Sequence, residues 1–589
     1  MAVLATRVLV PVEHRVWIAR LAEGFSSILT SVSKAGYRRS GIALLGLFIP
    51  VAFMECALGA PPIAGPWNVL LFLDEAWRVV NGQVPQTDFY SPIGPMTALF
   101  TAIGMKIAPP SASSITYGVV LLAALVLPLV WRIAKDRLPW ALALLCSILA
   151  GTYLLSPRPP AYGIRDTGYA MLYNRESYVL FLALCLCLFL KRRAPVWESD
   201  YFDRAFAKRH APVRRSDCLD GAFAGLLLAL LLYWKITYFV AAVEIAIASA
   251  FLIPKFREWY LAAGAAFAGV CAALFALLGI SLPRYVANLV YAVKVQSPET
   301  RSHLLLASLN HNAMWMYLLF FCLALLSWTW SRSTRAPFAI ARIWLVAASI
   351  ILAVLFIESG NASQGEGLED PLYFLTAVIT FELFRRIEAE DVAKKGSSAR
   401  IVYTASFALL WSLFFGSIMI GEAASYAYTV AWDVARRPYT PASQQFHSTQ
   451  LIDFHVPSGT DHITGYWPAR DLPGHINDGI DLLRRNLRSG ESVTTLDFAN
   501  PFSFALGIKP ARDRVLFWDL HVTFDDKNPP SASEFLGNSS VVMVPRLLDR
   551  RTGFGFDTFD TMMALYGDYL HDHFHEVEST ADWTMYRRN

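Results

Sequence analysis

The chain has 589 residues, of which 55% are hydrophobic and only 17% are charged, and its mean hydropathy is +0.39. Soluble globular proteins carry about 25% charged residues, so this composition excludes a water-soluble enzyme and a disordered chain. The net charge is +4, and the seven cysteines lie in apolar stretches or in one basic loop, which excludes a disulfide-stabilised scaffold. The sequence therefore predicts a polytopic membrane protein.

Apolar blocks long enough to cross about 30 Å of hydrocarbon recur along residues 41–420. We predict about eleven transmembrane helices, at 41–58, 115–132, 138–155, 177–191, 220–234, 236–253, 260–280, 315–330, 341–357, 371–386 and 401–420. Residues 1–40 contain several Lys and Arg but no short apolar core with a cleavage site, so we expect a cytoplasmic N-terminal tail there.

The distribution of Lys and Arg predicts the orientation of the chain. With the N-terminus inside, the predicted cytoplasmic segments hold about three times as many of them as the external loops before residue 421. The apolar stretch Pro92–Ala108 is interpreted as a helix along the outer membrane surface, because counting it as a span would put the basic loop Lys191–Arg215 outside. Residues 59–114 then form one long external loop, and the C-terminus is expected outside.

After a linker at 421–474, residues 475–589 are expected to form a small extracytoplasmic α/β domain. The pattern predicts helices at Asp478–Leu487 and Phe559–Leu570, and strands at Ser492–Leu496, Arg514–Phe517, Val541–Val544 and Trp583–Tyr586. His571, His573 and His575 alternate with other residues. On a strand their imidazoles would share one face and suit a metal, whereas a helix would separate them, so the sequence leaves a metal site unknown.

Three acidic residues, Asp74, Glu75 and Asp88, cluster in the first external loop, with Arg78 as the nearby cation. A Gly-x-x-Pro break at Gly82–Pro85 separates the acids, and Asp88-Phe89-Tyr90 precedes the surface helix. Acidic side chains in a wet loop are often only solvated, but this clustering favours a function. Two structural alternatives stay open: Asp74 as the N-cap of the helix that follows it, and Asp88 as an Asx turn.

This arrangement of Asp-Glu, helix, Gly-x-x-Pro and Asp-Phe-Tyr resembles the first external loop of the GT-C glycosyltransferases. It is more closely similar to the bacterial branch that includes the lipid A aminoarabinose transferase and the galacturonosyltransferases of lipopolysaccharide, and the likeness in architecture extends over nearly the whole chain. The aminoarabinose branch carries Glu-Lys before Pro-Pro, whereas this chain reads Asp88-Phe89-Tyr90-Ser91-Pro92. This departure favours the broader group over an aminoarabinose substrate.

The resemblance implies inverting transfer of a sugar from a polyprenyl-phosphate donor to a glycolipid, polysaccharide or protein acceptor, on the outer face of a bacterial-type inner membrane. Asp74 matches the first-loop acid of the family and is expected to take the acceptor's proton. Asp88 is expected to orient the acceptor or to hold a catalytic Lys or Arg. Glu75 is expected to be a solvent-facing or metal-coordinating neighbour. The expected partners are the lipid-linked donor, membrane lipid and a glycan acceptor, without nucleic acid; no cofactor is required, and a divalent cation stays open.

Further substrate-binding candidates lie in the other external loops. Arg175 and Glu176 open the fourth span in a stretch that resembles an acidic site of the family, and Lys235, at the outer end of the fifth span, resembles a phosphate ligand. The alternatives are that Arg175 and Glu176 only pair with each other and that Lys235 only reaches the interface. The remaining candidates are Arg301 and His303 for phosphate, with ordinary surface charge as the alternative. Gln364 is a candidate for sugar hydroxyls, with a flexible polar turn as the alternative.

Two other classes of function stay open: a transporter or flippase of an amphiphilic substrate, and a lipid-linked oligosaccharide ligase or polymerase. Transporters bind substrates near the bilayer midplane, whereas the charged residues here gather in external loops. Only Glu244 is central, and we expect it to be neutral inside the bundle or part of an ion path. The sequence contains no P-loop or dinucleotide-binding turn, which argues against soluble nucleotide chemistry.

Overall fold

A computed structural model provides the fold. It describes residues 34–63, 66–159, 163–192, 213–295, 298–330, 337–360, 370–391, 405, 406, 408, 412, 416–435, 445–456, 472–512, 515–546 and 556–589. Most of the predicted N-terminal tail, most of the predicted linker and the candidate Gln364 therefore lie outside the described residues.

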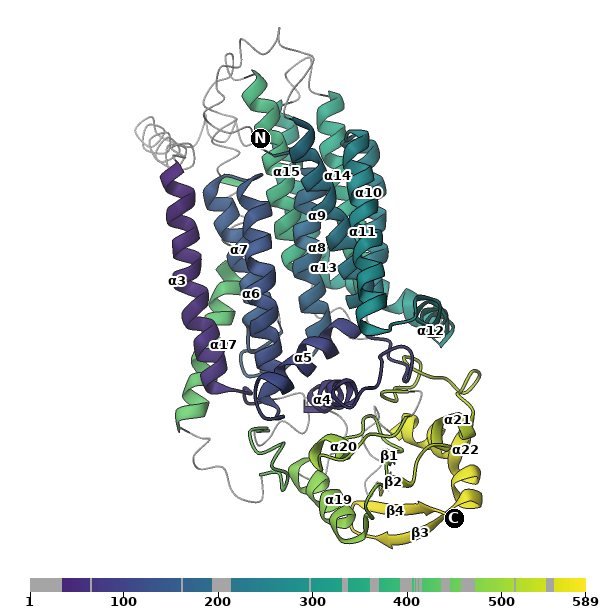
Figure 1. The fold of residues 1–589 in the computed structure, drawn as a ribbon. Coiled ribbons are helices and arrows are strands. Elements are labelled where there is room, and N and C mark those ends of the chain that lie inside the picture. Colours follow the sequence, from purple (N-terminus) through teal and green to yellow (C-terminus); the bar gives the residue numbers. More distant parts are fainter. Residues whose placement is uncertain are drawn as a thin grey trace.

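Most of the chain is a bundle of helices (Figure 1). Its members are α3 (Lys34–Leu58), α6 (Ser113–Lys135), α7 (Trp140–Leu155), α8 (Leu172–Phe189), α9 (Val213–Trp234), α10 (Ile236–Leu252), α11 (Arg257–Leu278), α13 (Pro298–Trp330), α14 (Pro337–Ser359), α15 (Asp370–Asp391) and α17 (Ser417–Ala435). Within the described residues, six helices are long and apolar enough to cross a membrane, or seven if the bent α13 is one span. The chain is a polytopic helical membrane protein, as the composition predicted.

Each of the first ten predicted spans overlaps one helix of this bundle. Most of the eleventh, at 401–420, lies outside the described residues, and α17 continues to Ala435, beyond the expected start of the linker. Glu244 of α10 is exposed on the surface of the bundle, so the alternative that it is buried inside was wrong. Its part in an ion path stays a prediction. The number of spans and the orientation of the chain in the membrane stay predictions.

Small residues let two helices of the bundle approach closely. Gly221 and Gly225 stand four residues apart on α9 and face α11. A Cβ on Gly221 would lie 2.1 Å from the carbonyl oxygen of Trp259, and a Cβ on Gly225 would lie 2.0 Å from that of Ala263. Helices in membranes pack through such small-x-x-x-small patterns because apolar side chains gain little by leaving lipid for protein. This contact fixes α9, whose last residues contribute to the site described below.

Two short helices, α4 (Pro66–Val80) and α5 (Pro95–Ile107), lie at the end of the bundle that faces the C-terminal sheet (Figure 1). Helix α5 falls within the predicted surface helix at Pro92–Ala108. Helix α12 (Leu282–Val295) lies at the same end. The first external loop of the prediction therefore folds against the end of the bundle.

The C-terminal residues form a four-stranded sheet of order β1-β2-β4-β3, in which β1 and β2 are parallel and the other pairs antiparallel. Its strands are β1 (Val493–Thr495), β2 (Val541–Pro545), β3 (Phe574–Ser579) and β4 (Trp583–Arg588), and its helices are α19 (Leu472–Asn486), α20 (Phe502–Ala505), α21 (Ala532–Leu536) and α22 (Phe556–His573). The strand predicted at Arg514–Phe517 was wrong: Val515 makes only an isolated bridge, with Tyr90, while the sequence analysis missed β3.

Helix α4 is also the surface on which the C-terminal part packs. Trp67 meets Phe498 edge to face with ring centroids 6.4 Å apart, and Trp77 meets Phe504 at 5.9 Å. These aromatic rings belong to one continuous hydrophobic core that runs from the bundle into the C-terminal part. Because aromatic pairs bury large apolar areas, they fix the sheet against the first external loop.

Candidate active site

Asp74 lies in the middle of α4 and is completely buried. Its Oδ2 accepts a hydrogen bond from Nε of Arg78, one helical turn later, at 2.9 Å, and both side chains are 1% exposed. The alternative that Asp74 caps a helix is therefore wrong, because α4 begins at Pro66, a residue type favoured in the first turn of a helix. The i, i+4 spacing of an acid and a base on one helical face accounts for the pair.

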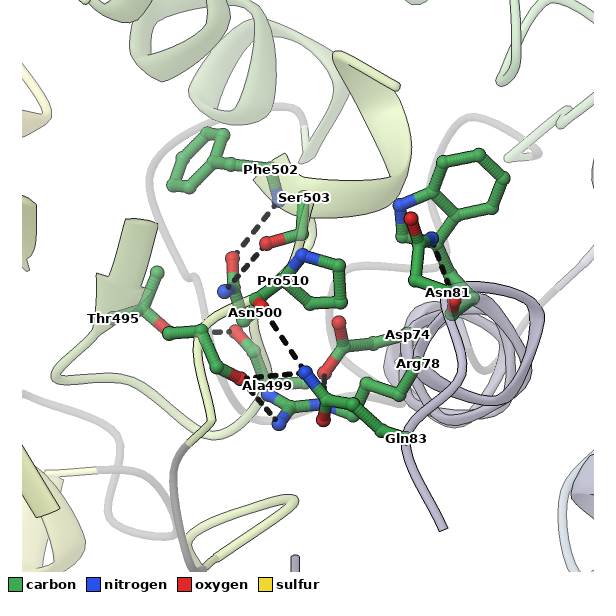
Figure 2. Close-up of polar contacts among 12 residues, drawn as sticks. Asp74, Arg78, Asn81, Gln83, Thr495, Ala499, Asn500, Phe502, Ser503 and Pro510 are labelled. Carbon is green, nitrogen blue, oxygen red and sulfur yellow. Dashed lines mark hydrogen bonds and ion pairs between the residues drawn. The ribbon is translucent and has the colours of Figure 1, made fainter. Parts of the chain in front are cut away.

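Side chains of α4 and of the loop that follows it bind backbone carbonyl oxygens of the segment 508–511 (Figure 2). Nη1 of Arg78 donates to the carbonyl of Ala511 at 3.1 Å, and Nε2 of Gln83 donates to the carbonyls of Pro510 and Ala511 at 3.0 and 3.2 Å. Asp74 thus lies where α4 contacts the C-terminal part. Arg78 bonds both Asp74 and the carbonyl of Ala511, and so links the two.

Glu75 is also completely buried, so the expectation that it faces solvent was wrong. Within the described residues, neither carboxylate oxygen has a hydrogen-bond partner that meets ordinary geometry. Burial raises the pKa of Glu75 to about 8; the Ser91 side chain lowers the pKa, the negative charge of Asp74 raises it and Arg78 lowers it. A carboxyl group with such a pKa exchanges its proton near neutral pH, which is the range a general acid or base needs.

Asp88 follows the Gly-x-x-Pro break and holds the loop closed. Its Oδ2 accepts from the backbone N–H of Val84 at 2.8 Å, four residues earlier, rather than from a residue two positions later as in an Asx turn. Its Oδ1 lies 3.9 Å from Nη1 of Arg512, which is the cation that the structure places beside it. Asp88 therefore orders the loop between α4 and α5 and faces the C-terminal part.

Lys235 separates α9 from α10 and has an extended backbone conformation, with φ −155° and ψ 117°. Its Nζ lies 4.5 Å from the centroid of the Tyr173 ring, which is short enough for a cation–π interaction. The ring of Tyr173 in turn contacts Phe72 of α4, with centroids 6.2 Å apart. The half-buried lysine is thus two aromatic contacts away from the helix that carries Asp74 and Glu75.

Glu176, near the start of α8, contacts residues that are far from it in the sequence. Its Oε2 accepts hydrogen bonds from Nε1 of Trp234, at 2.6 Å, and from Oγ1 of Thr97, at 2.5 Å. Its Oε1 is buried without a hydrogen-bond partner among the residues that the structure describes. The backbone N–H of Gly94 donates to the carbonyl of Trp234, and a Cβ at Gly94 would lie 2.3 Å from that oxygen. Only glycine lets the loop before α5 approach the end of α9 this closely.

Arg175, the neighbour of Glu176, belongs to a different cluster. Its Nε donates to the carbonyl of Tyr153 at 2.9 Å, and its Nη2 donates to the carbonyl of Ser156 at 2.5 Å. Glu422 of α17 accepts a hydrogen bond from the Ser156 hydroxyl and forms an ion pair with Nη2 of Arg158 at 3.2 Å. No hydrogen bond or ion pair between Arg175 and Glu176 occurs in the described part of the chain.

His303 is exposed on α13, and the side chain of Arg301 and all of Gln364 lie outside the described residues. His571 and His573 end α22, whereas His575 belongs to β3, and no group of three metal-ligating side chains occurs within the part that the structure describes.

Thr97 and Trp234, which hydrogen-bond Glu176, are functional candidates that the sequence pattern does not reveal. No local pattern reveals them, because they lie 79 and 58 residues away from Glu176 in the chain. The partnership of Arg78 with Asp74, in contrast, is visible in the i, i+4 spacing.

Among solved structures, the chain is similar to ArnT from Cupriavidus metallidurans, in the apo state and bound to undecaprenyl phosphate. Both matches have 11% identity and a TM-score of 0.43, and they cover 93% and 94% of this chain and 98% of those chains. It is also similar to the Archaeoglobus fulgidus oligosaccharyltransferase in complex with Zn and sulfate, with 11% identity, a TM-score of 0.37, and 92% of this chain and 73% of that chain covered. No protein-family model and no curated protein matches the chain. At this identity, none of the likenesses shows what the chain binds or transfers.

Proposed function

We propose that this chain is an inverting GT-C-type glycosyltransferase, which moves a sugar from a polyprenyl-phosphate donor to a glycan or glycolipid acceptor on the outer face of the membrane. The observation that carries the proposal is the pair of buried carboxyl groups on α4, Asp74 and Glu75, joined through Phe72 and Tyr173 to a lysine at the end of an apolar bundle. An acid for the acceptor and a cation for a phosphate, beside helices that suit a lipid tail, are what this reaction needs.

The chemistry follows from a single displacement. The acceptor hydroxyl oxygen attacks the anomeric carbon, the bond from that carbon to the phosphate oxygen breaks, and the polyprenyl phosphate leaves with the bonding electrons. The hydroxyl proton passes to a carboxylate. We assign this role to Asp74, because it matches the first-loop acid of the resemblance and Arg78 holds its carboxylate in place at 2.9 Å. Lys235 offsets the charge that develops on the departing phosphate.

Glu75 and Glu176 are proposed to bind substrate hydroxyl groups. Each has at least one buried carboxylate oxygen without a partner among the described residues. Buried polar atoms are nearly always hydrogen-bonded, so such oxygens suit a polar ligand. Asp88 is proposed to support the site from the loop between α4 and α5, since its carboxylate is engaged by Val84 and Arg512. The contacts of Arg175 favour a role in holding α7 and α8 together.

The proposal is tested with the purified full-length chain in nanodiscs, supplied with polyprenyl-phosphate-linked sugars and an envelope glycolipid fraction, with mass spectrometry of the products. Asp74→Asn should lower turnover by about 10²- to 10⁴-fold, the range that general bases contribute. Asp481→Asn is the matched control, because Asp481 is exposed on α19 and pairs with His447. Equal turnover of Asp74→Asn and wild type would remove Asp74 as the base.

Lys235→Ala should weaken binding of the donor by about tenfold or more, the worth of a hydrogen bond to a charged group. The measurement is titration of the same nanodiscs with donor lipid. Unchanged donor affinity would mean that the lysine only contacts Tyr173 and the interface.

One observation favours the alternative, a transporter or flippase. Helix α13 bends by 57° between its Ser302–Asn310 and Asn312–Trp328 parts, and broken helices are common at the binding sites of transporters. Movement of a fluorescent lipid across proteoliposomes without any glycosyl product would support that alternative and contradict the transferase.

A further inference from the structure

The bend in α13 marks a second polar region of the bundle, apart from the carboxyl groups of α4. Sharply bent membrane helices are tolerated where the bend is buried in protein or lines a polar cavity. Asn312 is the first residue of the second part of α13, and its side chain is completely buried. The bend therefore coincides with a buried amide side chain near the middle of α13.

Asn312 connects α13 to the end of α14. Its Nδ2 donates to Oε2 of Glu358 at 2.7 Å and to the carbonyl of Ser308, one turn earlier, at 2.9 Å. Ser308 and Asn312 are 0% exposed and Glu358 is 2% exposed. Within the described residues, Oδ1 of Asn312 and Oγ of Ser308 have no hydrogen-bond partner. Three polar side chains thus share one buried place, and two of them present atoms that are still able to bond a ligand.

This cluster of Ser308, Asn312 and Glu358 lies close to the start of α10. Glu358 is in the last turn of α14, and a Cβ on Gly360 would lie 2.8 Å from Cγ2 of Thr237. The Oγ1 of Thr237 is buried and has no partner among the described residues. Thr237 follows Lys235 by two residues, so the cluster and the proposed phosphate ligand stand at the same end of α10.

We propose that Ser308, Asn312 and Glu358 form a sugar subsite that hydrogen-bonds the hydroxyl groups of the donor's sugar; this inference rests on the proposed function. A carboxylate and an amide oxygen accept hydrogen bonds from hydroxyl groups, and a serine hydroxyl both donates and accepts.

The test compares two ligands on the purified full-length chain in nanodiscs: undecaprenyl phosphate alone, and undecaprenyl phosphate carrying glucose. Asn312→Ala and Glu358→Gln should lower the affinity for the glucose-bearing lipid by about 10- to 100-fold, the range of hydrogen bonds to charged groups, and leave the affinity for the bare lipid phosphate unchanged. Ser349→Ala is the matched control on α14, because the Ser349 hydroxyl bonds only to carbonyls of its own helix among the described residues. Ser308→Ala serves as a milder variant if a larger change prevents folding.

Two results would overturn the inference while leaving the proposed function intact: an equal loss for both lipids in the variants, or unchanged affinity for both. Absence of wild-type binding to either lipid would instead contradict the proposed function, and the subsite with it. Loss confined to the glucose-bearing lipid, with the control unchanged, supports the inference.

Discussion

Replacing Arg78 with methionine tests whether α4 holds the C-terminal segment as the structure indicates. The substitution keeps much of the apolar stem of the side chain but removes the guanidinium that bonds Asp74 and the carbonyl of Ala511. Both partners of the ion pair are 1% exposed, so water does not replace the lost contacts without opening the interface. The effect should therefore concentrate where α4 meets the segment 508–511.

The magnitude follows from burial. Removing one partner of a buried ion pair costs about 3–5 kcal/mol, because the other charge stays buried and unpaired. The pair formed by Arg484 and Asp481 on α19 has side chains 46% and 40% exposed, and exposed pairs contribute about 0–1 kcal/mol. Arg78→Met should thus lower the local opening free energy several times more than the matched control, Arg484→Met.

Hydrogen exchange of peptides that cover residues 499–512, followed by mass spectrometry, measures that opening free energy directly. A double-mutant cycle with Asp74→Asn should give a coupling of about 2 kcal/mol or more, because the two side chains act through one contact. A cost below about 1 kcal/mol for Arg78→Met, equal to that of the control, would refute the account of this interface.

Two further predictions concern the loop that surrounds these residues. Burial raises the pKa of Glu75 to about 8, so the stability that the protonated side chain contributes is fully present below pH 4.5 and is lost as the pH rises through 8. The wild-type melting temperature should fall over that range. Glu75→Gln should remove this part of the dependence of the melting temperature on pH. An identical slope in both proteins would contradict the burial of the carboxyl group. Gly94→Ala should destabilise the protein by about 1–3 kcal/mol or more, because its Cβ would meet a carbonyl oxygen at 2.3 Å, whereas Gly264→Ala on α11, with nothing within 4 Å, should be neutral or stabilising in the same thermal assay.

The helices of the bundle were predictable because apolar blocks of spanning length are a strong signal. Ten predicted spans overlap helices of the structure. The C-terminal sheet was harder. Strand β3 carries exposed polar residues such as His575 and Glu576 and has no apolar alternation, while Val515 lies in an apolar run that makes only an isolated bridge. Short strands depend on their partners more than on their own sequence, and the partner of β3 is the last strand of the chain.

The candidate site shows the same division between local and long-range information. Asp74 and Arg78 stand one turn apart, so their pairing follows from the sequence once a helix is assumed. The burial of Glu75 does not follow, because the local sequence does not show that α4 would lie between the bundle and the C-terminal part. Arg175 and Glu176 are adjacent on α8, yet they bond to different parts of the chain, since neighbouring residues on a helix point about 100° apart.

Cysteine labelling shows on which face of the membrane the carboxyl groups of α4 lie, and we expect the outer face. Lys106, on α5 beside the site, and Lys191, after α8, are both exposed. We predict that an impermeant maleimide labels Lys106→Cys in intact spheroplasts above the wild-type background, and labels Lys191→Cys only after the membrane is permeabilised. Labelling of Lys191→Cys alone in intact spheroplasts would place the loop in the cytoplasm and contradict the account.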